Sequence, residues 1–214
     1  MNWGHLFTAL GEGMLVSLAI FLLTLLFSLP LGMVIAFGRM AKNVVIRTVT
    51  KVYISIMRGT PLMLQLFVVF FAPGLLFNIP FSNRFVATII AFSLNYAAYF
   101  AEIYRGGIES ISDGQYEAAK VLGYSKGQTF GCIILPQVIK RILPSVTNEI
   151  ITLVKDTSLA FAIGTIELFT QAKMLGAAES SMIPYIVAGV FYYIFNMVVA
   201  VGMERIEKKL NYYR

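Results

Sequence analysis

Residues 14–38 read MLVSLAIFLLTLLFSLPLGMVIAFG and contain no charged side chain. The hydrocarbon core of a bilayer is about 30 Å thick, so a helix needs about 20 apolar residues to cross it. This segment is long enough to do so. No Lys or Arg precedes it, and its apolar run is too long for a cleaved signal peptide, so we expect it to stay in the protein as a first membrane span.

Four further apolar runs have a similar length, at residues 53–77, 85–104, 145–169 and 184–203. The chain as a whole is 58% hydrophobic and 13% charged, whereas an average soluble domain is roughly 25% charged. No linker or internal repeat divides it. The sequence therefore predicts an all-α membrane protein with five transmembrane helices in a single domain, residues 1–214.

The basic residues are placed as in a membrane protein. Lys and Arg concentrate on cytoplasmic loops, and the connections after the second and fourth runs hold only Arg84 and Lys173. We therefore expect the N-terminus outside, the C-terminus in the cytoplasm, and no nucleic-acid partner. The remaining basic residues outside the apolar runs follow the first, third and fifth of them: Arg39, Lys42, Arg47, Lys51, Arg105, Lys120, Lys126, Lys140, Arg141, Arg205, Lys208, Lys209 and Arg214.

Several classes of active site are disfavoured by composition. Cys132 is the only cysteine and His5 the only histidine, so we expect no internal disulfide, no multi-histidine metal site and no histidine-dependent catalysis. No Gly-x-x-x-x-Gly-Lys-Ser/Thr phosphate loop occurs, so the chain has no Walker-type ATP site. An intramembrane enzyme also lacks a convincing nucleophile here.

The longest polar connection, about residues 109–141, lies between the third and fourth spans. Its capping pairs and its glycine predict two short helices, at about residues 113–122 and 126–135, with Pro136 ending the second. An ordinary amphipathic pair on the membrane surface fits these features equally. The residues that define the helix ends are Ser112 with Gln115, Ser125 with Gln128, and Gly123.

A spacing pattern in this loop favours one alternative. Glu117-Ala118-Ala119 is followed after three residues by Gly123, and Ile133 and Leu135-Pro136 stand further along. This pattern resembles the loop signature of ATP-binding-cassette importer permeases. The resemblance implies that the first loop helix seats in a cleft of a separate ATPase, with coupling residues Glu117, Ala118, Ala119 and Gly123.

Three other stretches resemble the polar amino-acid branch of that family: RGTPL at residues 58–62, AEIYRGGI at 101–108 and LVKDTSL at 153–159. The resemblance implies a non-enzymatic permease of a bacterial cytoplasmic membrane that works by alternating access. It also implies two ATPase subunits that carry the ATP and Mg, with no cofactor in this chain. Its other expected partners are a second permease chain, identical or homologous, an external substrate-binding protein, membrane lipid and the amino acid.

Polar side chains mark one face of the third span and one face of the fourth. Charged groups inside spans cost about 2.5–3.5 kcal/mol on insertion scales and usually face a protein interior or a watery cavity. Facing stripes would form a passage rich in carboxylates, which predicts arginine, lysine or histidine as substrate. Thr60 and Ser158 are candidates for the substrate's α-carboxylate. The stripes consist of Asn95, Tyr99 and Glu102 on one span, and of Glu149, Thr152 and Asp156 on the other.

Structural roles for the same residues stay open. Glu102 pairs in this alternative with Arg105 or Arg58, and Glu149 with Lys155 or Arg141, which would only lock helices together. Hydroxyls of Thr and Ser in spans also bond back to helix carbonyls. Another function remains as well, a stand-alone secondary carrier that uses the carboxylates for proton or sodium coupling. It would leave the loop pattern unexplained.

Overall fold

The computed structural model describes residues 2–210, and its regular structure over that range is helical with no strand. The predicted all-α class is confirmed. Arg214 and the two extremes of the predicted domain 1–214 lie outside the described residues. The elements are α1 Trp3–Arg39, α2 Val44–Gly59, α3 Leu62–Phe77, α4 Arg84–Glu109, α5 Asp113–Val121, α6 Lys126–Gln128, the π-helix η1 Thr129–Ile134, α7 Leu135–Asp156, the 3₁₀ helix η2 Thr157–Ile163, α8 Leu168–Glu179 and α9 Ile183–Leu210.

Four helical segments of the described chain are long and apolar enough to cross a membrane: Trp3–Arg39, Arg84–Glu109, Lys126–Ile163 and Ile183–Leu210. A fifth candidate appears if α2 and α3 are counted as one broken span, because they meet at an angle of 112°. The predicted span at 53–77 falls across that break. The segment is therefore sharply bent where the hydropathy pattern showed one continuous run.

The break between α2 and α3 has a local cause. Thr60 is extended, and Pro61, which has no N–H to donate, caps α3. The carbonyls freed here are bonded by Gln65, whose Nε2 donates to the carbonyl of Met57 at 3.0 Å and to the carbonyl of Thr60 at 3.1 Å. A side chain on α3 thus holds the end of α2 at its bend.

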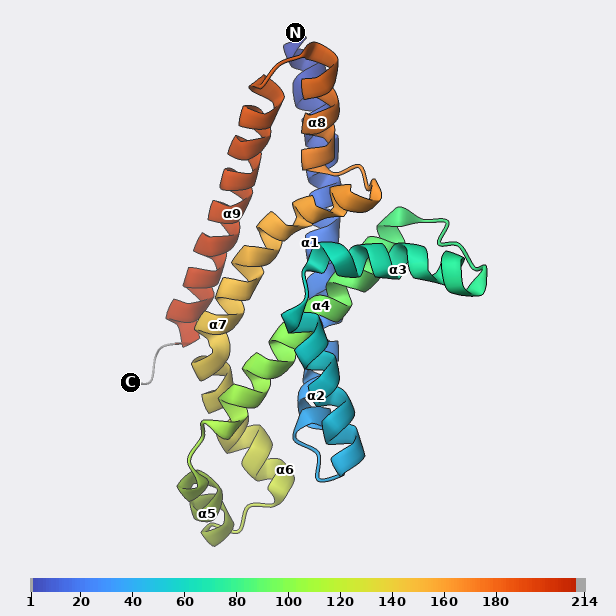
Figure 1. The fold of residues 1–214 in the computed structure, drawn as a ribbon. Coiled ribbons are helices and arrows are strands. Elements are labelled where there is room, and N and C mark those ends of the chain that lie inside the picture. The colour runs from blue at the N-terminus through green and yellow to red at the C-terminus, as the bar shows by residue number, and fades with distance from the viewer. Residues whose placement is uncertain (1, 211–214) are drawn as a thin grey trace.

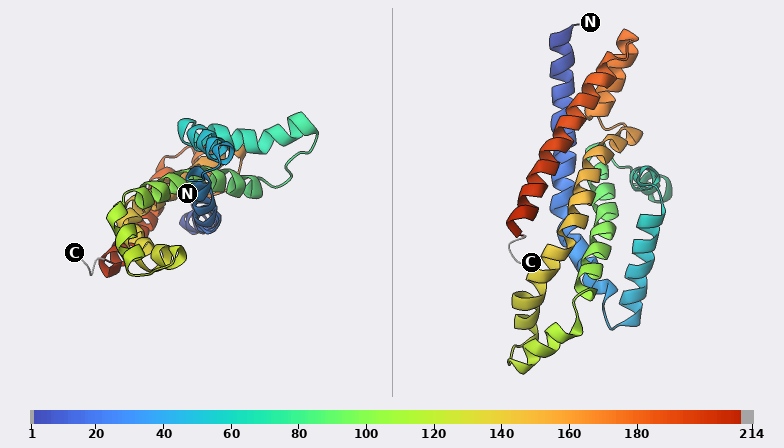
Figure 2. Two further views of the ribbon diagram at one scale, coloured as in Figure 1. Left: turned by 90° about the horizontal axis from the view of Figure 1, so that it is seen from below. Right: turned by 90° about the vertical axis from the view of Figure 1, so that its left-hand side faces the viewer.

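Among the described elements the most extensive contact is between α1 and α4, which cross in Figure 1 and lie next to each other in the right-hand view of Figure 2. Gly32 permits part of this approach, since a β-carbon there would lie 2.9 Å from the β-carbon of Phe100. Helix α9 packs on α7 and α8. The start of α1 lies with α8 at one end of the molecule, and α5 lies at the opposite end (Figure 1).

The first loop helix, α5, forms close to its predicted position. Gly123 follows it with a φ of +80°, and the N–H of Tyr124 donates to the carbonyl of Ala119 at 3.0 Å, which is a Schellman stop. Ser125 forms the predicted capping box with Gln128. Ser112 does precede α5, but its side chain makes no capping bond, so only the backbone marks that helix start.

The predicted end of the second loop helix at Pro136 is wrong. Helical structure continues without a gap from Lys126 through Ile163, and Pro136 lies in the first turn of α7. Proline is tolerated in a first turn, where its missing N–H is not needed. The π-helical turn of η1 precedes it and absorbs the change of register, so the loop's second helix is the beginning of the fourth span.

Candidate functional site

Asp156 ends α7, and its carboxylate faces α4. The hydroxyl of Tyr96, a buried residue of α4, donates to Asp156 Oδ2 at 2.7 Å. This bond joins the predicted polar faces of the third and fourth spans. Asp156 itself is half-buried and has no ion-pair partner within the described part of the chain. One of its oxygens therefore remains open to a further donor.

Glu149 lies two turns before Asp156 on α7 and is half-buried. Neither partner proposed for a helix lock holds it. Arg141 donates instead to the carbonyl of Ser110, and Lys155 is exposed, without an ion pair among residues 2–210. The Glu149 carboxylate is acted on first by the charge of Arg58 and then by that of Asp156, and it has no bonded cation among the described residues.

Glu102 is held differently. Its carboxylate forms an ion pair with Arg105, whose Nε donates to Glu102 Oε1 at 3.0 Å. Arg105 also pairs with Glu109 one turn later. All three residues lie on α4, so this pairing stabilises a single helix and joins no helix to another. The partner is one that the structural alternative named, Arg105, but the pair does not lock two helices together.

Tyr99 completes the polar face of α4. The centroid of the Tyr99 ring lies 6.2 Å from that of Tyr96. The guanidinium carbon of Arg58 lies 5.4 Å from the same Tyr99 centroid. Arg58 belongs to the last turn of α2. A cation is therefore already present next to an aromatic face and within the field of the Glu102 and Glu149 carboxylates.

Asn95 and Thr60 meet through Gln65. Asn95 Nδ2 donates to Gln65 Oε1 at 2.9 Å and to the Met57 carbonyl at 3.0 Å, while Gln65 Nε2 donates to Thr60 Oγ1 at 2.8 Å. These amides serve the bend between α2 and α3. The Ser158 hydroxyl donates to the carbonyl of Lys155 at 2.8 Å, which is the ordinary back-bond of a helical serine.

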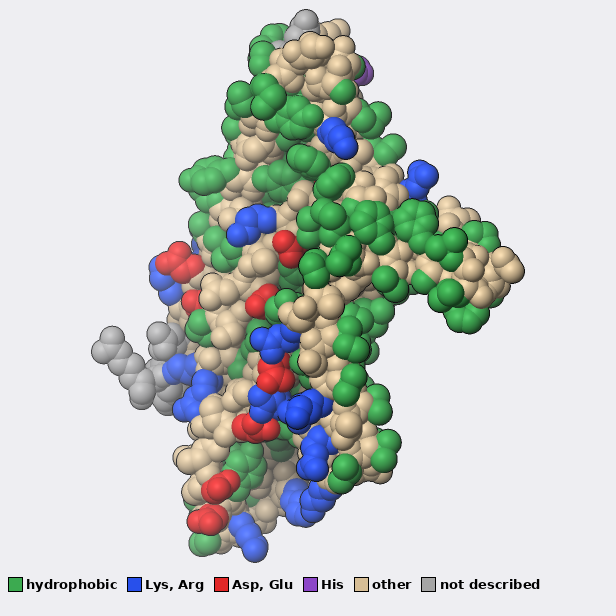
Figure 3. All heavy atoms as spheres, viewed as in Figure 1, with side chains coloured by type: hydrophobic (Ala, Val, Ile, Leu, Met, Phe, Trp, Pro, Cys, Tyr) green, Lys and Arg blue, Asp and Glu red, His purple; other side chains and the backbone are tan. Residues whose placement is uncertain are grey.

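The charged residues form a visible column. In Figure 3, acidic and basic side chains are interspersed down the middle of the face shown, with apolar side chains mainly to their right. Interspersed signs bring neighbouring charges into attraction and keep each of them partly solvated. Such a mixed face offers groups of both signs to a charged ligand.

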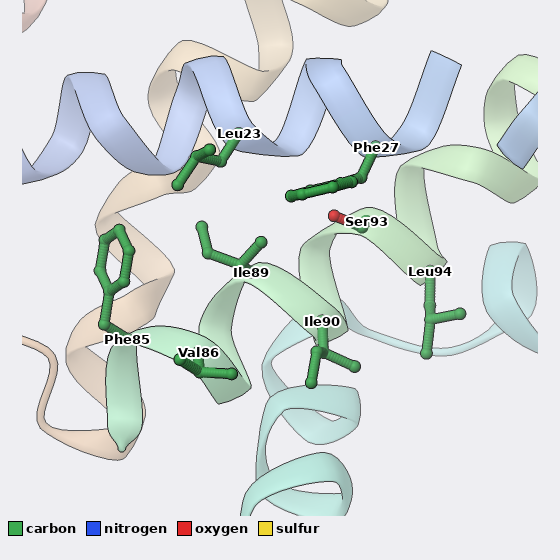
Figure 4. A pocket seen from close by; sticks show the side chains of 8 residues that line it. All are labelled: Leu23, Phe27, Phe85, Val86, Ile89, Ile90, Ser93 and Leu94. Atoms are coloured by element: carbon green, nitrogen blue, oxygen red, sulfur yellow. The ribbon is translucent and has the colours of Figure 1, made fainter. Parts of the chain in front are cut away.

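An apolar pocket elsewhere is a poor alternative. It has a volume of about 550 Å³ and opens between α1 and α4. Figure 4 shows that its lining is hydrocarbon apart from the Ser93 hydroxyl. Nothing in it compensates the charges of an amino acid, so we assign no substrate to it.

The loop between α4 and α7 presents a second candidate surface, on α5. Glu117 and Ala118 of α5 are exposed, as a docking role requires, whereas Ala119 is only 1% exposed and packs inside the chain. Two large apolar side chains at the end of the helix are left open, Val121 at 87% and Leu122 at 73% exposure. These two adjacent apolar side chains make this helix end the candidate contact surface of the loop.

The chain matches one protein family over most of its length. Residues 28–212 match the family described as the binding-protein-dependent transport system inner membrane component. The chain belongs to this family. It is therefore a multi-pass permease of the inner membrane.

Individual permeases of the family are similar to this one nearly end to end. It is 39% identical to the putative glutamine transport system permease protein GlnP of Rickettsia bellii over 200 residues, covering 93% of this chain and 91% of that protein. It is 37% identical to the L-cystine permease TcyB of Bacillus subtilis, with 95% and 87% covered. Identity is also 37% to the arginine permease ArtQ of the same species, with 93% and 91% covered.

A solved structure shares the fold. The permease superposes on a chain of a crystal structure described as an amino acid ABC transporter with histidines, with a TM-score of 0.87 and 30% identity over 94% of each chain. The chain is thus an amino-acid importer permease driven by ATP hydrolysis on a separate ATPase subunit and supplied by a substrate-binding protein. The stand-alone secondary carrier is set aside.

Three residues of the permease's polar interior were missed by sequence reasoning. Tyr96 lies between the predicted positions Asn95 and Tyr99 and turns toward α7. Gln65 is the single polar residue in the apolar run LMLQLF, and an amide in such a run signals a buried hydrogen-bond network. Glu167, fully buried ahead of α8, is the third.

Glu167 is satisfied by its own neighbourhood. It accepts from the backbone N–H groups of Phe169 at 2.7 Å and Thr170 at 2.8 Å, and from the Tyr192 hydroxyl at 3.0 Å. It lies between η2 and α8, outside the candidate spans. Burial raises the pKa of the Glu167 carboxyl above its usual range, although these donors act in the opposite direction.

Proposed function

We propose that this permease translocates an amino acid with a cationic side chain, arginine, lysine or histidine. The observation that carries the proposal is the pair of half-buried carboxylates on α7, Glu149 and Asp156, neither of which has a cation bonded to it in the described chain. A carboxylate removed from water is costly unless a cation compensates it. A cationic substrate supplies that compensation and leaves when the passage opens to water.

The aromatic pair on α4 suits the same ligand. Tyr99 offers a ring face, and Tyr96 fixes one oxygen of Asp156. A guanidinium or ammonium group is attracted by both a ring face and a carboxylate. We place the charged end of the substrate between Tyr99, Glu149 and Asp156, with Asn95, Ser158 and Thr60 bordering the site and Glu102 supporting it.

The similar proteins leave this substrate choice open between classes, because their names cite glutamine, cystine and arginine transport. A competition experiment decides it. The purified permease–ATPase complex is loaded with radiolabelled arginine and challenged with each proteinogenic amino acid. Displacement by lysine, histidine and arginine, with weak displacement by glutamine, is expected. Preferential displacement by glutamine or by acidic amino acids refutes the proposal.

For the loop, we propose that α5 docks on the ATPase with Glu117, Ala118, Val121 and Leu122 and turns at Gly123, while Ala119 keeps α5 packed on its own chain. The exposed apolar end of α5 supports this. Fully burying a valine or leucine side chain contributes about 1.5–3 kcal/mol. Leu122→Ala should therefore weaken ATPase binding about tenfold or more, measured by titrating the ATPase into the purified permease.

Val121→Ala should also weaken ATPase binding, and Val45→Ala on α2 is its control, because it removes the same atoms from a residue of comparable exposure, 70% against 87%. We expect no change in ATPase affinity for Val45→Ala. Equal effects at the two positions would exclude α5 as the specific docking element.

We further propose the assembly and orientation that family resemblance implies. Two permease chains, identical or homologous, bind two ATPases that carry ATP and Mg, and the N-terminus lies outside. The clustering of basic side chains in the lower part of Figure 3, toward α2 and α5, supports a cytoplasmic position for that end. Closing of the ATPases then shifts the population of permease states, which requires them to bind those states unequally.

A further inference from the structure

Arg58 is the one cation that reaches the proposed substrate site from α2. Its guanidinium lies 5.4 Å from the centroid of the Tyr99 ring. Its charge acts on both Glu102 and Glu149, yet among the ion pairs of residues 2–210 none includes Arg58. It is therefore near carboxylates without being locked to either.

One of these two carboxylates already has another partner. Glu102 is already paired with Arg105 through the Nε donor at 3.0 Å. The contacts of Arg58 are thus a ring face and a surrounding negative field, which hold a guanidinium loosely and in a defined orientation. The side chain is exposed, so water can replace these contacts when it leaves.

The contact chain beyond Arg58 leads to the open carboxylate. The Tyr99 ring lies 6.2 Å from the Tyr96 ring, and the Tyr96 hydroxyl donates to Asp156 at 2.7 Å. A ring face with carboxylates around it is what the guanidinium or ammonium group of a cationic amino acid needs. Arg58 thus lies at the Tyr99 ring face, the same position that the charged end of the proposed substrate requires.

The backbone next to Arg58 is suited to withdrawal. Gly59 has no atom within 4 Å of the place where a β-carbon would stand, and α2 ends there in a bend of 112° to α3. Glycine at the end of a helix gives the chain freedom to change direction. The chain at Gly59 is therefore free of close side-chain contacts, and the neighbouring Arg58 side chain is itself exposed.

We propose that Arg58 is a tethered competitor that occupies the cation position of the empty site and is displaced by the side chain of a cationic substrate. The inference rests on the proposed cationic substrate and names a residue that sets its affinity. Return of Arg58 to the ring face would favour release of the cargo. A neutral amino acid has no charge to compete for this position, so Arg58 lowers affinity for cationic substrates selectively.

The test compares arginine and glutamine binding to the purified permease–ATPase complex, without the substrate-binding protein, by direct radioligand titration. Arg58→Gln should raise arginine affinity about 2- to 5-fold relative to glutamine, the size expected for a lost exposed cation–π contact. Arg58→Lys, which keeps the charge but stacks less well, should give a smaller gain. Lys51→Gln, an exposed charge removed from the same helix, is the matched control and should change neither affinity.

The outcomes separate the two proposals. If the wild-type complex binds no cationic amino acid, the proposed function fails. If the wild type binds arginine and the arginine-to-glutamine affinity ratio is unchanged or lower in Arg58→Gln, only the tethered competitor fails. Thermal unfolding of each variant reports whether it is folded. If Arg58→Gln does not fold, the change in the arginine-to-glutamine affinity ratio of Arg58→Lys tests the tethered competitor: a gain supports it, and no gain refutes it.

Discussion

Helix α4 and helix α7 each carry a half-buried carboxylate, Glu102 and Glu149, but the two carboxylates are held differently. Glu102 on α4 is neutralised by Arg105, three residues further along the same helix. Glu149 on α7 has no such partner among the described residues, although Arg141 and Lys155 are near it in sequence. An internally paired charge stabilises a helix, whereas an unpaired one in a membrane protein indicates a ligand.

The largest expected effect comes from the unpaired side of this comparison. Glu149→Gln and Asp156→Asn each remove a negative charge while keeping a carbonyl oxygen, so Tyr96 retains an acceptor in Asp156→Asn. A hydrogen bond to a charged group contributes about 1.5–3 kcal/mol, so arginine affinity should fall about 10- to 100-fold in either variant. Equilibrium binding to the purified permease–ATPase complex measures it.

Glu12→Gln is the control for these two substitutions, because Glu12 is an exposed carboxylate of α1 away from the charged column. Its arginine affinity should equal that of the wild type. Unchanged arginine affinity in both Glu149→Gln and Asp156→Asn would remove the contrast between α4 and α7.

The contrast extends to uncharged groups. Gln65 and Asn95 are hydrogen-bonded to each other and to the carbonyl of Met57. Like Glu102, they therefore have partners within the protein, and their role is to stabilise the fold. Gln65→Leu leaves buried polar groups without a partner, which costs about 1–3 kcal/mol. The melting temperature in detergent should drop accordingly. Leu64→Ala, at an exposed site on the same helix, should change the melting temperature little. Equal drops in melting temperature for the two variants would contradict the stabilising role of the Gln65 hydrogen bonds.

The sequence predicts features that depend on neighbouring residues better than contacts between residues far apart in the chain. Local signals were read correctly in part. The apolar runs at 14–38, 85–104 and 184–203 lie within α1, α4 and α9, Ser125 with Gln128 forms a cap, and Gly123 forms a stop. The runs at 53–77 and 145–169 instead cross breaks after Gly59 and Ile163. The predicted helix end at Pro136 was wrong, because a proline is found both after the end of a helix and in the first turn of one. The adjacent π-helical turn, which the sequence does not reveal, places Pro136 in the first turn of α7.

The candidate site was predictable in part for the same reason. Helical spacing placed Glu149 and Asp156 on one face, but whether Glu102 pairs with Arg105 or Arg58 depends on rotamers and on the bend of α2. The partnership of Tyr96 with Asp156 joins residues 60 positions apart. No local pattern reports such a contact.

Glu167 sharpens the comparison as a carboxylate neutralised by hydrogen-bond donors in place of a cation. Because its pKa is raised by burial, the folded state holds this proton more tightly than the unfolded chain does. The associated stability is fully present below the ordinary glutamate pKa of about 4.3 and is lost as pH rises through the raised value. Glu167→Gln cannot titrate.

Melting temperatures of wild type and Glu167→Gln across a pH series test this. The stability of the wild type relative to the variant should decline as pH rises. The variant also loses an acceptor for the N-terminal amides of α8, which lowers stability by about 1 kcal/mol at every pH. A difference between the two proteins that does not change with pH would show that Glu167 has the same pKa folded and unfolded.

The smallest effect is expected at Glu102, the paired side of the comparison. Its side chain is 25% exposed and that of Arg105 is 24% exposed, and such partly solvated pairs contribute about 0–1 kcal/mol. Arg105 keeps Glu109 as a partner when Glu102 is neutralised, so no cation is left alone. Glu102→Gln should therefore change arginine affinity by less than about 3-fold and melting temperature only slightly. A double-mutant cycle with Arg105→Gln measures the pair directly. A loss of arginine affinity as large as in Glu149→Gln would move Glu102 from a helix-stabilising role into the substrate site.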